Sequence, residues 1–371
     1  MTRFRRTVDT MNNSSLPSDS PTTDYRLFLY TQLATGICLA ILSPITITSN
    51  VLLLFTLFKD PLKCFRAPAT YFIVALALVD LTTGLLVEPF FIMHRVATYV
   101  KGSPAPCEPY NTLYQIGVWL SYVGLNASFL LVLGLILTQY VAITYPHHYR
   151  SEVTTRRVLA CVGFSLVYFT GFILLQFVVV PKETLFQVDL HLHSTLITVL
   201  LILSSAILLR SLRHFATESR RLVGESGVET GVHGRHTGKP RTNRISEKQF
   251  TIVTLLLSGV FIVCSLPHII TVHMRFYKKQ HTLQERLDLS AAITIADEMM
   301  FVKVALDAFI YAWRLTKYRK SLKLVLTCRR NQVLPETTEV MTMENFTFQQ
   351  YNPELSSNHQ DRPKINLHDQ L

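Results

Sequence analysis

Five long stretches of this sequence contain no Asp, Glu, Lys or Arg, and they constrain the fold more than any other feature. They are residues 27–58, 109–149, 158–180, 190–209 and 249–274. The hydrocarbon core of a bilayer is about 30 Å thick, so a helix of roughly 20 apolar residues crosses it. Only 16% of the residues are charged, whereas soluble domains average about 25%. The chain is therefore predicted to be an integral membrane protein.

Two further stretches are apolar but carry a few ionisable residues. Residues 67–96 include Asp80, Glu88 and Arg95, and residues 289–313 include Asp297, Glu298, Lys303 and Asp307. Counting both gives seven spans. We therefore predict an all-α membrane protein, a seven-transmembrane helix bundle over residues 27–314 with a short amphipathic eighth helix after it.

The distribution of Lys and Arg predicts the orientation of the spans. The loops after spans one, three and five, together with the C-terminal segment, hold 24 of the 36 Lys and Arg residues, whereas the N-terminal segment and the other loops hold 11. Cytoplasmic loops carry the excess of positive residues. We expect a multi-pass protein of the plasma membrane with its N-terminus extracellular. The net charge of +11 accordingly indicates topology and a lipid-bilayer partner, and no nucleic-acid partner.

The N-terminal segment 1–26 is expected to be extracellular. Asn12 and Asn13 are each followed two residues later by Ser, so both are candidate N-glycosylation sites. The segment lacks an apolar signal core, and the first span is expected to serve as its own insertion signal. Met11 is an alternative start, because the three arginines ahead of it disfavour export.

Three cytoplasmic segments are predicted from composition. The loop 210–248 is rich in Gly, Ser, Thr and Arg and is expected to be mobile. Residues 315–328 place apolar side chains at helical spacing between basic ones, which predicts an amphipathic helix on the anionic membrane surface. Cys328 at its end is either palmitoylated or a free thiol. The polar tail 329–371 is expected to be disordered.

Several motifs then point to a family. One runs from Phe65 to Leu81 and continues from Gly84 to Phe90, and further marks are Asn50, residues 142–146, Tyr149, Phe261, Cys264, Pro267, Tyr311 and Tyr318. At these separations the region from about 49 to 328 resembles the rhodopsin-like G-protein-coupled receptors, and the longest motif is similar to amine-type receptors. The resemblance implies a receptor that signals to a heterotrimeric G protein, without cofactor, metal or catalytic residues.

The chain departs from this family in the parts of the helices that switch conformation. Members of the family end the third helix with an acid-Arg-Tyr triplet, whereas this chain has Thr138, Gln139 and Tyr140. These residues and Glu247 of the sixth helix are expected to face the G protein. Gln139 offers only neutral hydrogen bonds, so an ionic latch to Glu247 cannot form. The seventh helix has Ala308 in place of the usual proline, which predicts a straighter helix.

The second outer loop is predicted at residues 181–190. It contains no cysteine, and Cys107 lies upstream of the third-helix position that Tyr114 occupies. We therefore assign no extracellular disulfide.

A group of polar residues inside the spans is expected to form a buried switch: Asn50, Asp80, Lys303, Asp307 and Tyr311. In related receptors the counterpart of Asp80 and polar groups of the seventh helix surround a sodium ion. Lys303 lies four residues from Asp307 and shares its helical face, so its ammonium is a candidate replacement for that ion. The alternative is a packing salt bridge with no regulatory role. The spacing from Lys303 to Tyr311 is too short for the retinal-binding lysine of opsins.

The resemblance also implies a ligand cavity between the helices. The aspartate by which aminergic receptors bind amines corresponds here to Ser121, so a monoamine would lose its main counterion. Other acids, namely Glu88, Asp297 and Glu298, could bind a cation, or they pair with His94, Arg95 or Lys303. The expected lining adds Ser121, Tyr122, Leu125, Asn126, Phe177, His268 and Phe301 to Glu88 and Asp297. His268 is either a hydrogen-bonded core residue or a proton sensor.

The leading hypothesis is a cell-surface receptor that couples an unknown extracellular small molecule, organic cations included, to a G protein. The missing arginine leaves open a divergent receptor with weak or no coupling that scavenges ligand or recruits arrestin. Hydroxyl and acidic residues at 335–347 would supply a phosphorylated arrestin site. A transporter or intramembrane enzyme is a remote alternative, since neither a protease motif nor an internal repeat is present.

Overall fold

The computed structural model describes residues 24–62, 65, 67–104, 108–177, 181–225 and 239–327. Within these ranges the side chains of residues 150, 182, 219–225 and 239–247 are not described. All described residues belong to one unit, residues 1–327, and the tail from Cys328 onward is a second unit. Asn12, Asn13 and Cys328 lie outside the described residues, so the predictions of glycosylation and lipidation stay predictions.

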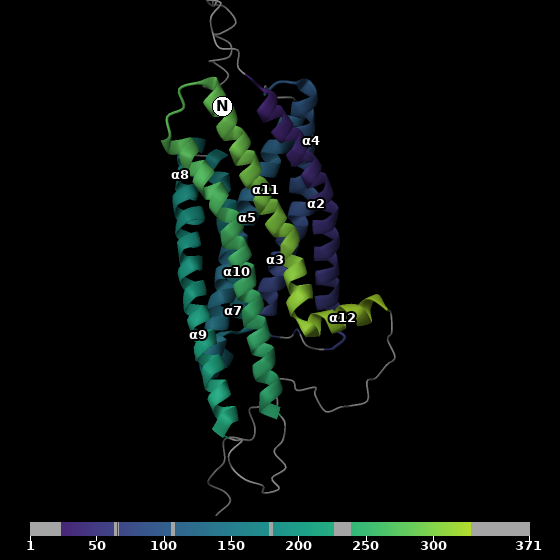
Figure 1. Ribbon diagram of the computed structural model, residues 1–371, viewed down its shortest axis with the longest axis vertical. Helices are drawn as coiled ribbons and strands as arrows, with labels where there is room; N and C mark the ends of the chain where they lie inside the picture. The colour runs from purple at the N-terminus through teal and green to yellow at the C-terminus, as the bar shows by residue number, and fades with distance from the viewer. Residues whose placement is uncertain are drawn as a thin grey trace, which may run out of the picture. The chain divides into compact units, whose positions relative to one another are not determined.

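Long helices that run along a common axis make up the described part of the chain (Figure 1). In chain order the α-helices are α2 (Arg26–Lys59), α3 (Thr70–Thr82), α4 (Glu88–Lys101), α5 (Tyr110–Thr144), α6 (Pro146–Glu152), α7 (Thr155–Leu174), α8 (Lys182–Val188), α9 (Ile197–Glu225), α10 (Lys239–Tyr277), α11 (Leu283–Arg314) and α12 (Thr316–Leu326). Two π-helical segments, Thr83–Val87 and Asp189–Leu196, join α3 to α4 and α8 to α9, and a 3₁₀ turn, Leu175–Phe177, ends α7. Asp189–Leu196 is called the π segment below.

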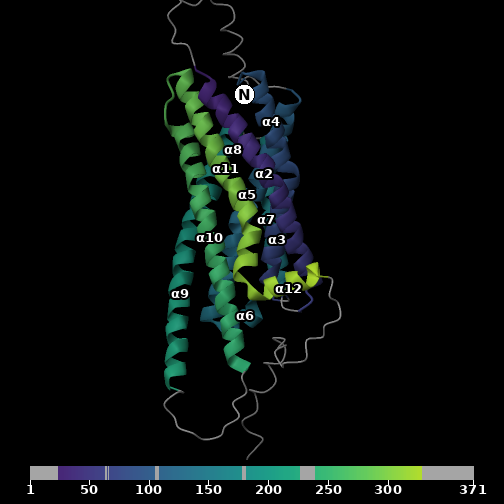
Figure 2. The ribbon, with the colours of Figure 1, turned by 45° about the vertical axis from the view of Figure 1, so that its right-hand side comes forward.

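Six continuous helical stretches are long and apolar enough to cross a membrane. They are Arg26–Lys59, Thr70–Lys101, Tyr110–Thr144, Thr155–Phe177, Glu183–Glu218 and Lys248–Tyr277. Helix α11 is the seventh long helix and carries the ionisable residues predicted for the last span. It lies between α2 and α10 (Figures 1 and 2). The predicted all-α membrane bundle is thus confirmed.

Two predicted loop assignments were wrong. Residues 181–190 are not an outer loop, because α8 begins at Lys182 and continues through the π segment into α9. The sequence predicts that the fifth span starts after Asp189, but that carboxylate is hydrogen-bonded inside the bundle and does not interrupt the helix. The loop predicted at 210–248 is also shorter than expected, since α9 reaches Glu225 and α10 starts at Lys239. A helix continues beyond its apolar part because Leu, Arg and Glu favour helix in water.

The bundle buries polar as well as apolar side chains and leaves apolar ones on its outer face. Phe164 and Val167 of α7 are 67% and 72% exposed, as expected for side chains that contact lipid. The first π-helical segment, Thr83–Val87, packs closely against α2. A Cβ added to Gly84 would lie only 3.0 Å from Thr46 Cγ2. The Ser43 hydroxyl donates to the carbonyl oxygen of Gly84 across this contact, at 2.9 Å.

Helix α11 is unbroken from Leu283 to Arg314, and the straightness predicted from Ala308 stays a prediction. Its start is defined by a capping box in which Thr282 and Glu285 exchange hydrogen bonds. After Leu315 the chain turns and α12 lies across the end of the bundle (Figure 2). Tyr318 of α12 is buried and packs edge-on against Phe65, with ring centres 6.5 Å apart. The location of α12 on a membrane surface stays a prediction.

Candidate functional site

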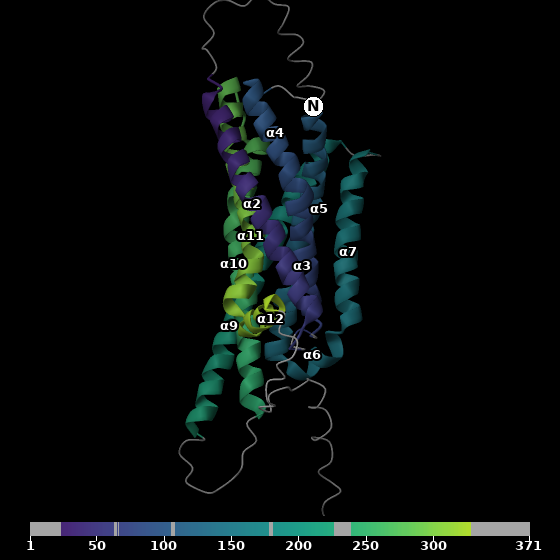
Figure 3. The same ribbon diagram turned by 90° about the vertical axis from the view of Figure 1, so that its right-hand side faces the viewer.

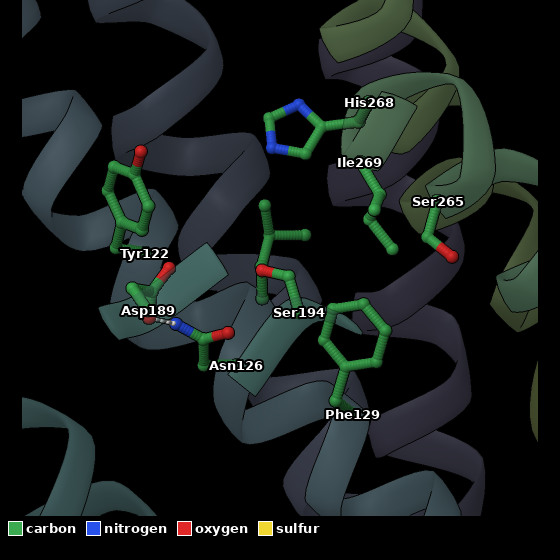
Figure 4. A pocket seen from close by; sticks show the side chains of 9 residues that line it. Tyr122, Asn126, Phe129, Asp189, Ser194, Ser265, His268 and Ile269 are labelled. Carbon is green, nitrogen blue, oxygen red and sulfur yellow. Dashed lines mark hydrogen bonds between the residues drawn. The ribbon is translucent and has the colours of Figure 1, made fainter. Parts of the chain in front are cut away.

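A narrow pocket lies between α5, the π segment and α10 (Figure 4). Its lining comprises Tyr122, Leu125, Asn126 and Phe129 of α5, Asp189 and Ser194 of the π segment, and Ser265, His268 and Ile269 of α10. Four residues predicted to line a ligand cavity, Tyr122, Leu125, Asn126 and His268, therefore meet around one space. Tyr122 is nearer the beginning of α5 and His268 nearer the end of α10, so the pocket lies toward the end of the bundle where α2 begins.

Asp189 is the acidic residue of this lining, and its carboxylate is held by two hydrogen bonds. Its Oδ1 atom accepts from Asn126 Nδ2 at 2.7 Å and pairs with His193 Nδ1 at 2.9 Å. The second ring nitrogen of His193 lies 3.0 Å from the hydroxyl of Tyr168. Asp189, His193 and Asn126 are 2%, 2% and 3% exposed. A buried carboxylate without such donors would be expensive, so this network is what makes the charge tolerable.

The local backbone explains how Asp189 and His193 reach this network. Both belong to the π segment, in which the wider turn displaces side chains from their usual helical positions. The Thr195 hydroxyl donates to the carbonyl oxygen of Leu190, five residues earlier, at 2.7 Å. The ring of His193 is packed by Phe169 and Phe172 of α7, with ring centres 4.9 Å and 4.6 Å away. Segments of this kind are frequent at functional sites.

The sequence reading missed Asp189 and His193. The signal that could have found them is their separation of four residues next to an otherwise uncharged run. Tyr168 gave no comparable signal, because nothing in the sequence distinguishes its hydroxyl from that of a lipid-facing tyrosine.

The acids predicted to bind a cation are already paired, each with a different group. Asp297 Oδ1 lies 2.6 Å from Nδ1 of His268, next to the pocket. Glu298 Oε2 lies 2.6 Å from Nη1 of Arg95 and both side chains are almost fully buried. Glu88 is fully buried and accepts a hydrogen bond from the Thr46 hydroxyl at 3.3 Å. Pairing with a neighbour, one of the two alternatives open from the sequence, therefore holds for Glu298 with Arg95.

Three further residues of the predicted cavity lie outside the pocket. Phe301 is buried against Phe91 of α4, with ring centres 5.3 Å apart. Phe177 packs edge-on against Trp119 at 5.1 Å, and Ser121 of α5 is half-buried outside the lining. The sequence does not show which face of a helix turns inward near an irregular turn. The pocket in the structure is therefore lined by only some of the residues predicted for the cavity.

Three residues of the predicted buried switch, Asp80, Lys303 and Asp307, lie together. Lys303 Nζ lies 2.6 Å from Asp307 Oδ2, 4.0 Å from Asp80 Oδ1 and 4.4 Å from the centre of the Phe261 ring. Lys303 is fully buried and both aspartates are 1% exposed. Tyr311 and Asn50 are buried too, and the Asn50 amide donates within its own helix to the Thr46 carbonyl oxygen at 3.0 Å. The ammonium thus occupies the space between the two carboxylates, as the sequence spacing suggested.

At the other end of the bundle, the residues predicted to face a G protein are partly enclosed. Thr138 donates to the carbonyl oxygen of Gly134 at 2.7 Å, and Tyr140 is half-buried. Gln139 is buried and accepts a hydrogen bond from Thr251 of α10 at 3.4 Å. Helix α5 therefore meets α10 through a neutral contact at this level. The side chain of Glu247 lies outside the described residues.

The described residues can be compared with the patterns that metal clusters and disulfides require. Groups of three or more His, Cys, Asp or Glu side chains that could hold a metal ion are absent from that part of the chain. Cys38, Cys161 and Cys264 are free thiols. The other three cysteines, Cys64, Cys107 and Cys328, lie outside the described residues.

The sequence is similar to receptors with seven membrane-spanning helices. The model of the 7 transmembrane receptor (rhodopsin family) matches residues 49–311. Tyramine receptor 1 of Locusta migratoria is 33% identical over 131 residues, 35% of this chain and 25% of that receptor. The 5-hydroxytryptamine receptor 1 of Drosophila melanogaster is 34% identical over 100 residues, 26% of this chain and 16% of that receptor.

A longer match of lower identity is to the Prostaglandin E2 receptor EP2 subtype of Mus musculus. It is 24% identical over 274 residues, 69% of this chain and 72% of that receptor. The chain therefore covers a quarter or less of the tyramine and 5-hydroxytryptamine receptors named above, but most of a receptor whose name indicates a different ligand.

Proposed function

Because the chain belongs to the rhodopsin family of seven-transmembrane receptors, we propose that it is a cell-surface G-protein-coupled receptor for a small organic cation. The observation that carries the proposal is the buried carboxylate of Asp189 in the lining of the pocket between α5, the π segment and α10. In helical bundles, small-molecule sites form between helices, with a few polar groups set among apolar ones.

The charge of the pocket favours a cation. The amide of Asn126 is neutral, and we take the His193 imidazole as neutral too, with Nδ1 donating to Asp189 and Nε2 accepting from the Tyr168 hydroxyl. Two neutral hydrogen bonds stabilise the Asp189 carboxylate but leave its negative charge for a ligand. The aromatic rings of Tyr122 and Phe129 line the same space (Figure 4) and offer faces to an ammonium group.

The relatives favour two different ligand classes. The names of the tyramine and 5-hydroxytryptamine receptors denote amines, whereas the prostaglandin receptor's name denotes a carboxylic acid lipid. An acid would need a free basic group in the pocket. In the lining, His268 is the residue that could be basic, and it is paired with Asp297. We therefore favour the amine class.

The proposed orientation follows from the charge of the loops. With 24 Lys and Arg residues in alternate loops and the C-terminal segment, the N-terminus is extracellular and α12 is cytoplasmic. The pocket then lies in the outer half of the plasma-membrane bundle, accessible to an extracellular ligand. In this proposal the G protein binds at the opposite end, near Gln139.

The test is direct binding by the full chain in lipid nanodiscs. Monoamines and their neutral hydroxyl analogues are compared by the rise in unfolding temperature that they cause in the wild type and in Asp189→Asn. We expect amines but not alcohols to stabilise the wild type, and Asp189→Asn to weaken the amine by about 30-fold or more, since losing one partner of a buried charge pair costs about 2 kcal/mol or more. Asp288→Asn, an exposed carboxylate of α11, is the matched control. Amine binding that survives in Asp189→Asn would show that the ligand lies elsewhere.

A second candidate function is a receptor with weak or no G-protein coupling, which scavenges ligand or recruits arrestin. It is favoured by one observation, the neutral contact of Gln139 with Thr251 where relatives of this family carry an arginine. A G protein would meet no cation at this position of α5. A comparison of G-protein activation by the wild type and by Gln139→Arg separates the two candidates.

A further inference from the structure

A cluster of two histidines and a tyrosine lies at the end of the bundle where α10 ends, outside the pocket. His191 belongs to the π segment, and His273 and Tyr277 belong to α10. The ring centres of His191 and His273 are 5.4 Å apart, and the Tyr277 hydroxyl lies 2.9 Å from Nε2 of His191. His191 and Tyr277 are exposed and His273 is half-buried, so ions in solution can reach the cluster.

Both imidazoles are held in the same tautomer. Nδ1 of His191 lies 2.7 Å from the carbonyl oxygen of Gln187, and Nδ1 of His273 lies 2.8 Å from that of Ile269. A carbonyl oxygen only accepts, so each Nδ1 carries the proton, and each neutral ring has its lone pair on Nε2. The Tyr277 hydroxyl donates to that lone pair in His191. A backbone carbonyl on the second nitrogen is the usual support of a metal-binding histidine, because it sets the tautomer and the ring orientation.

The spacing of the rings fits one shared ion. Two imidazoles bound through Nε2 to a tetrahedral zinc ion, each at about 2.0–2.1 Å, place their ring centres roughly 5 Å apart. The observed 5.4 Å between ring centres is close to this value, and binding needs the Nε2 atom of each ring to turn toward the ion. Imidazole nitrogen suits zinc, copper and nickel, whereas calcium and magnesium prefer oxygen.

We propose that His191 and His273 form a binding site for a divalent transition-metal ion, zinc by preference, that links the π segment to α10. Nε2 of each ring binds the ion, and the Tyr277 hydroxyl gives up its hydrogen bond to His191. In the described part of the chain no further His, Cys or acidic side chain completes the set, so water fills the remaining positions. The site does not depend on the proposed amine ligand, because none of its three residues lines the pocket.

Such an ion would hold α10 against the element that carries Asp189 and Ser194. It would stabilise whichever receptor conformation keeps the two rings at this distance, since a ligand shifts an equilibrium by its different affinity for the two states. The expected ligand chemistry is free or weakly chelated Zn²⁺ on the extracellular side.

The experiment measures the unfolding temperature of the full chain in nanodiscs during titration with Zn²⁺ alone. We expect a saturable rise of about 2 °C or more in the wild type. His191→Ala and His273→Ala should each raise the apparent Kd at least about tenfold, because losing even an outer-shell partner of a ligand weakens metal binding about 10–100-fold. Tyr277→Phe removes a competing donor but no imidazole, and should keep the effect.

Two exposed histidines provide matched controls. His281 lies shortly after α10, and His148 lies on α6 at the opposite end of the bundle. The control variants are His281→Ala and His148→Ala. Both variants should respond to Zn²⁺ like the wild type. The proposal is wrong if the wild type shows no saturable response, if either control abolishes it, or if His191→Ala and His273→Ala leave it unchanged. Co²⁺ absorption spectra of the folded wild type and His273→Ala check the nitrogen ligands without relying on stability.

Discussion

Replacing Lys303 by methionine should strongly destabilise the bundle. Lys303 is fully buried, with Asp307 Oδ2 at 2.6 Å and Asp80 Oδ1 at 4.0 Å. Methionine keeps most of the volume but leaves two buried carboxylates without a counterion. Breaking a buried pair in this way costs about 3–5 kcal/mol. For a chain of this size each kcal/mol lowers the unfolding temperature by roughly 2 °C, so a loss of about 6–10 °C is expected.

The two carboxylates should not contribute equally. Coulomb energy varies inversely with distance, so the 2.6 Å contact with Asp307 is about 1.5 times as strong as the 4.0 Å contact with Asp80. With Lys303 in place, Asp307→Asn should therefore lower the unfolding temperature more than Asp80→Asn. In the Lys303→Met background, either substitution should recover part of the lost stability, because it removes a buried carboxylate. The assay is thermal unfolding in nanodiscs at matched protein concentration.

An exposed lysine supplies the control for this series. Lys323→Met of α12 should change the unfolding temperature by less than about 1 °C, because exposed charges contribute little. The reasoning fails if Lys303→Met unfolds within 1 °C of the wild type, or if neither aspartate substitution recovers stability.

Three further outcomes are expected. Basal or ligand-stimulated signalling should be insensitive to sodium in the wild type and become sensitive in Lys303→Ala, and a sodium effect on the wild type would contradict the idea that the ammonium replaces the ion. Arg95→Met should lower the unfolding temperature, since it leaves buried Glu298 unpaired, and adding Glu298→Gln should restore it; a double variant as unstable as the single one would argue against the pair. Gly134→Ala should lower the free energy of unfolding by about 1–3 kcal/mol, because its Cβ would lie 2.9 Å from Phe72 Cε1. Gly163→Ala is the control, since its Cβ would have nothing within 4 Å. Unfolding measurements on both variants test this difference.

The membrane spans could be predicted from the sequence because the bilayer imposes one simple rule on them, a run of about 20 residues without charge. The same rule misplaced the start of the fifth span. It treats Asp189 as the end of an apolar run, but a carboxylate with two internal donors does not behave as a solvated charge. The error therefore fell on the residue that matters most for the pocket.

The pairing of buried charges was open to prediction only where the partners are close in sequence. Lys303 and Asp307 are four residues apart and share a helical face. Arg95 and Glu298 are 203 residues apart, so the sequence could offer Arg95 only as one of several partners for the acids. Similarly, the contacts between His191 and α10 depend on how the π segment rotates its side chains, and periodicity does not show this rotation.

The central claim, a receptor that signals to a G protein, is tested most directly by nucleotide exchange on purified G proteins. The wild type and Gln139→Arg are compared at matched surface expression, without ligand and with a library of amines. The account predicts that an amine stimulates exchange through the wild type, and that this response is lost in Asp189→Asn. If only Gln139→Arg stimulates exchange, the natural chain does not couple, and the scavenging or arrestin-recruiting function replaces the one proposed.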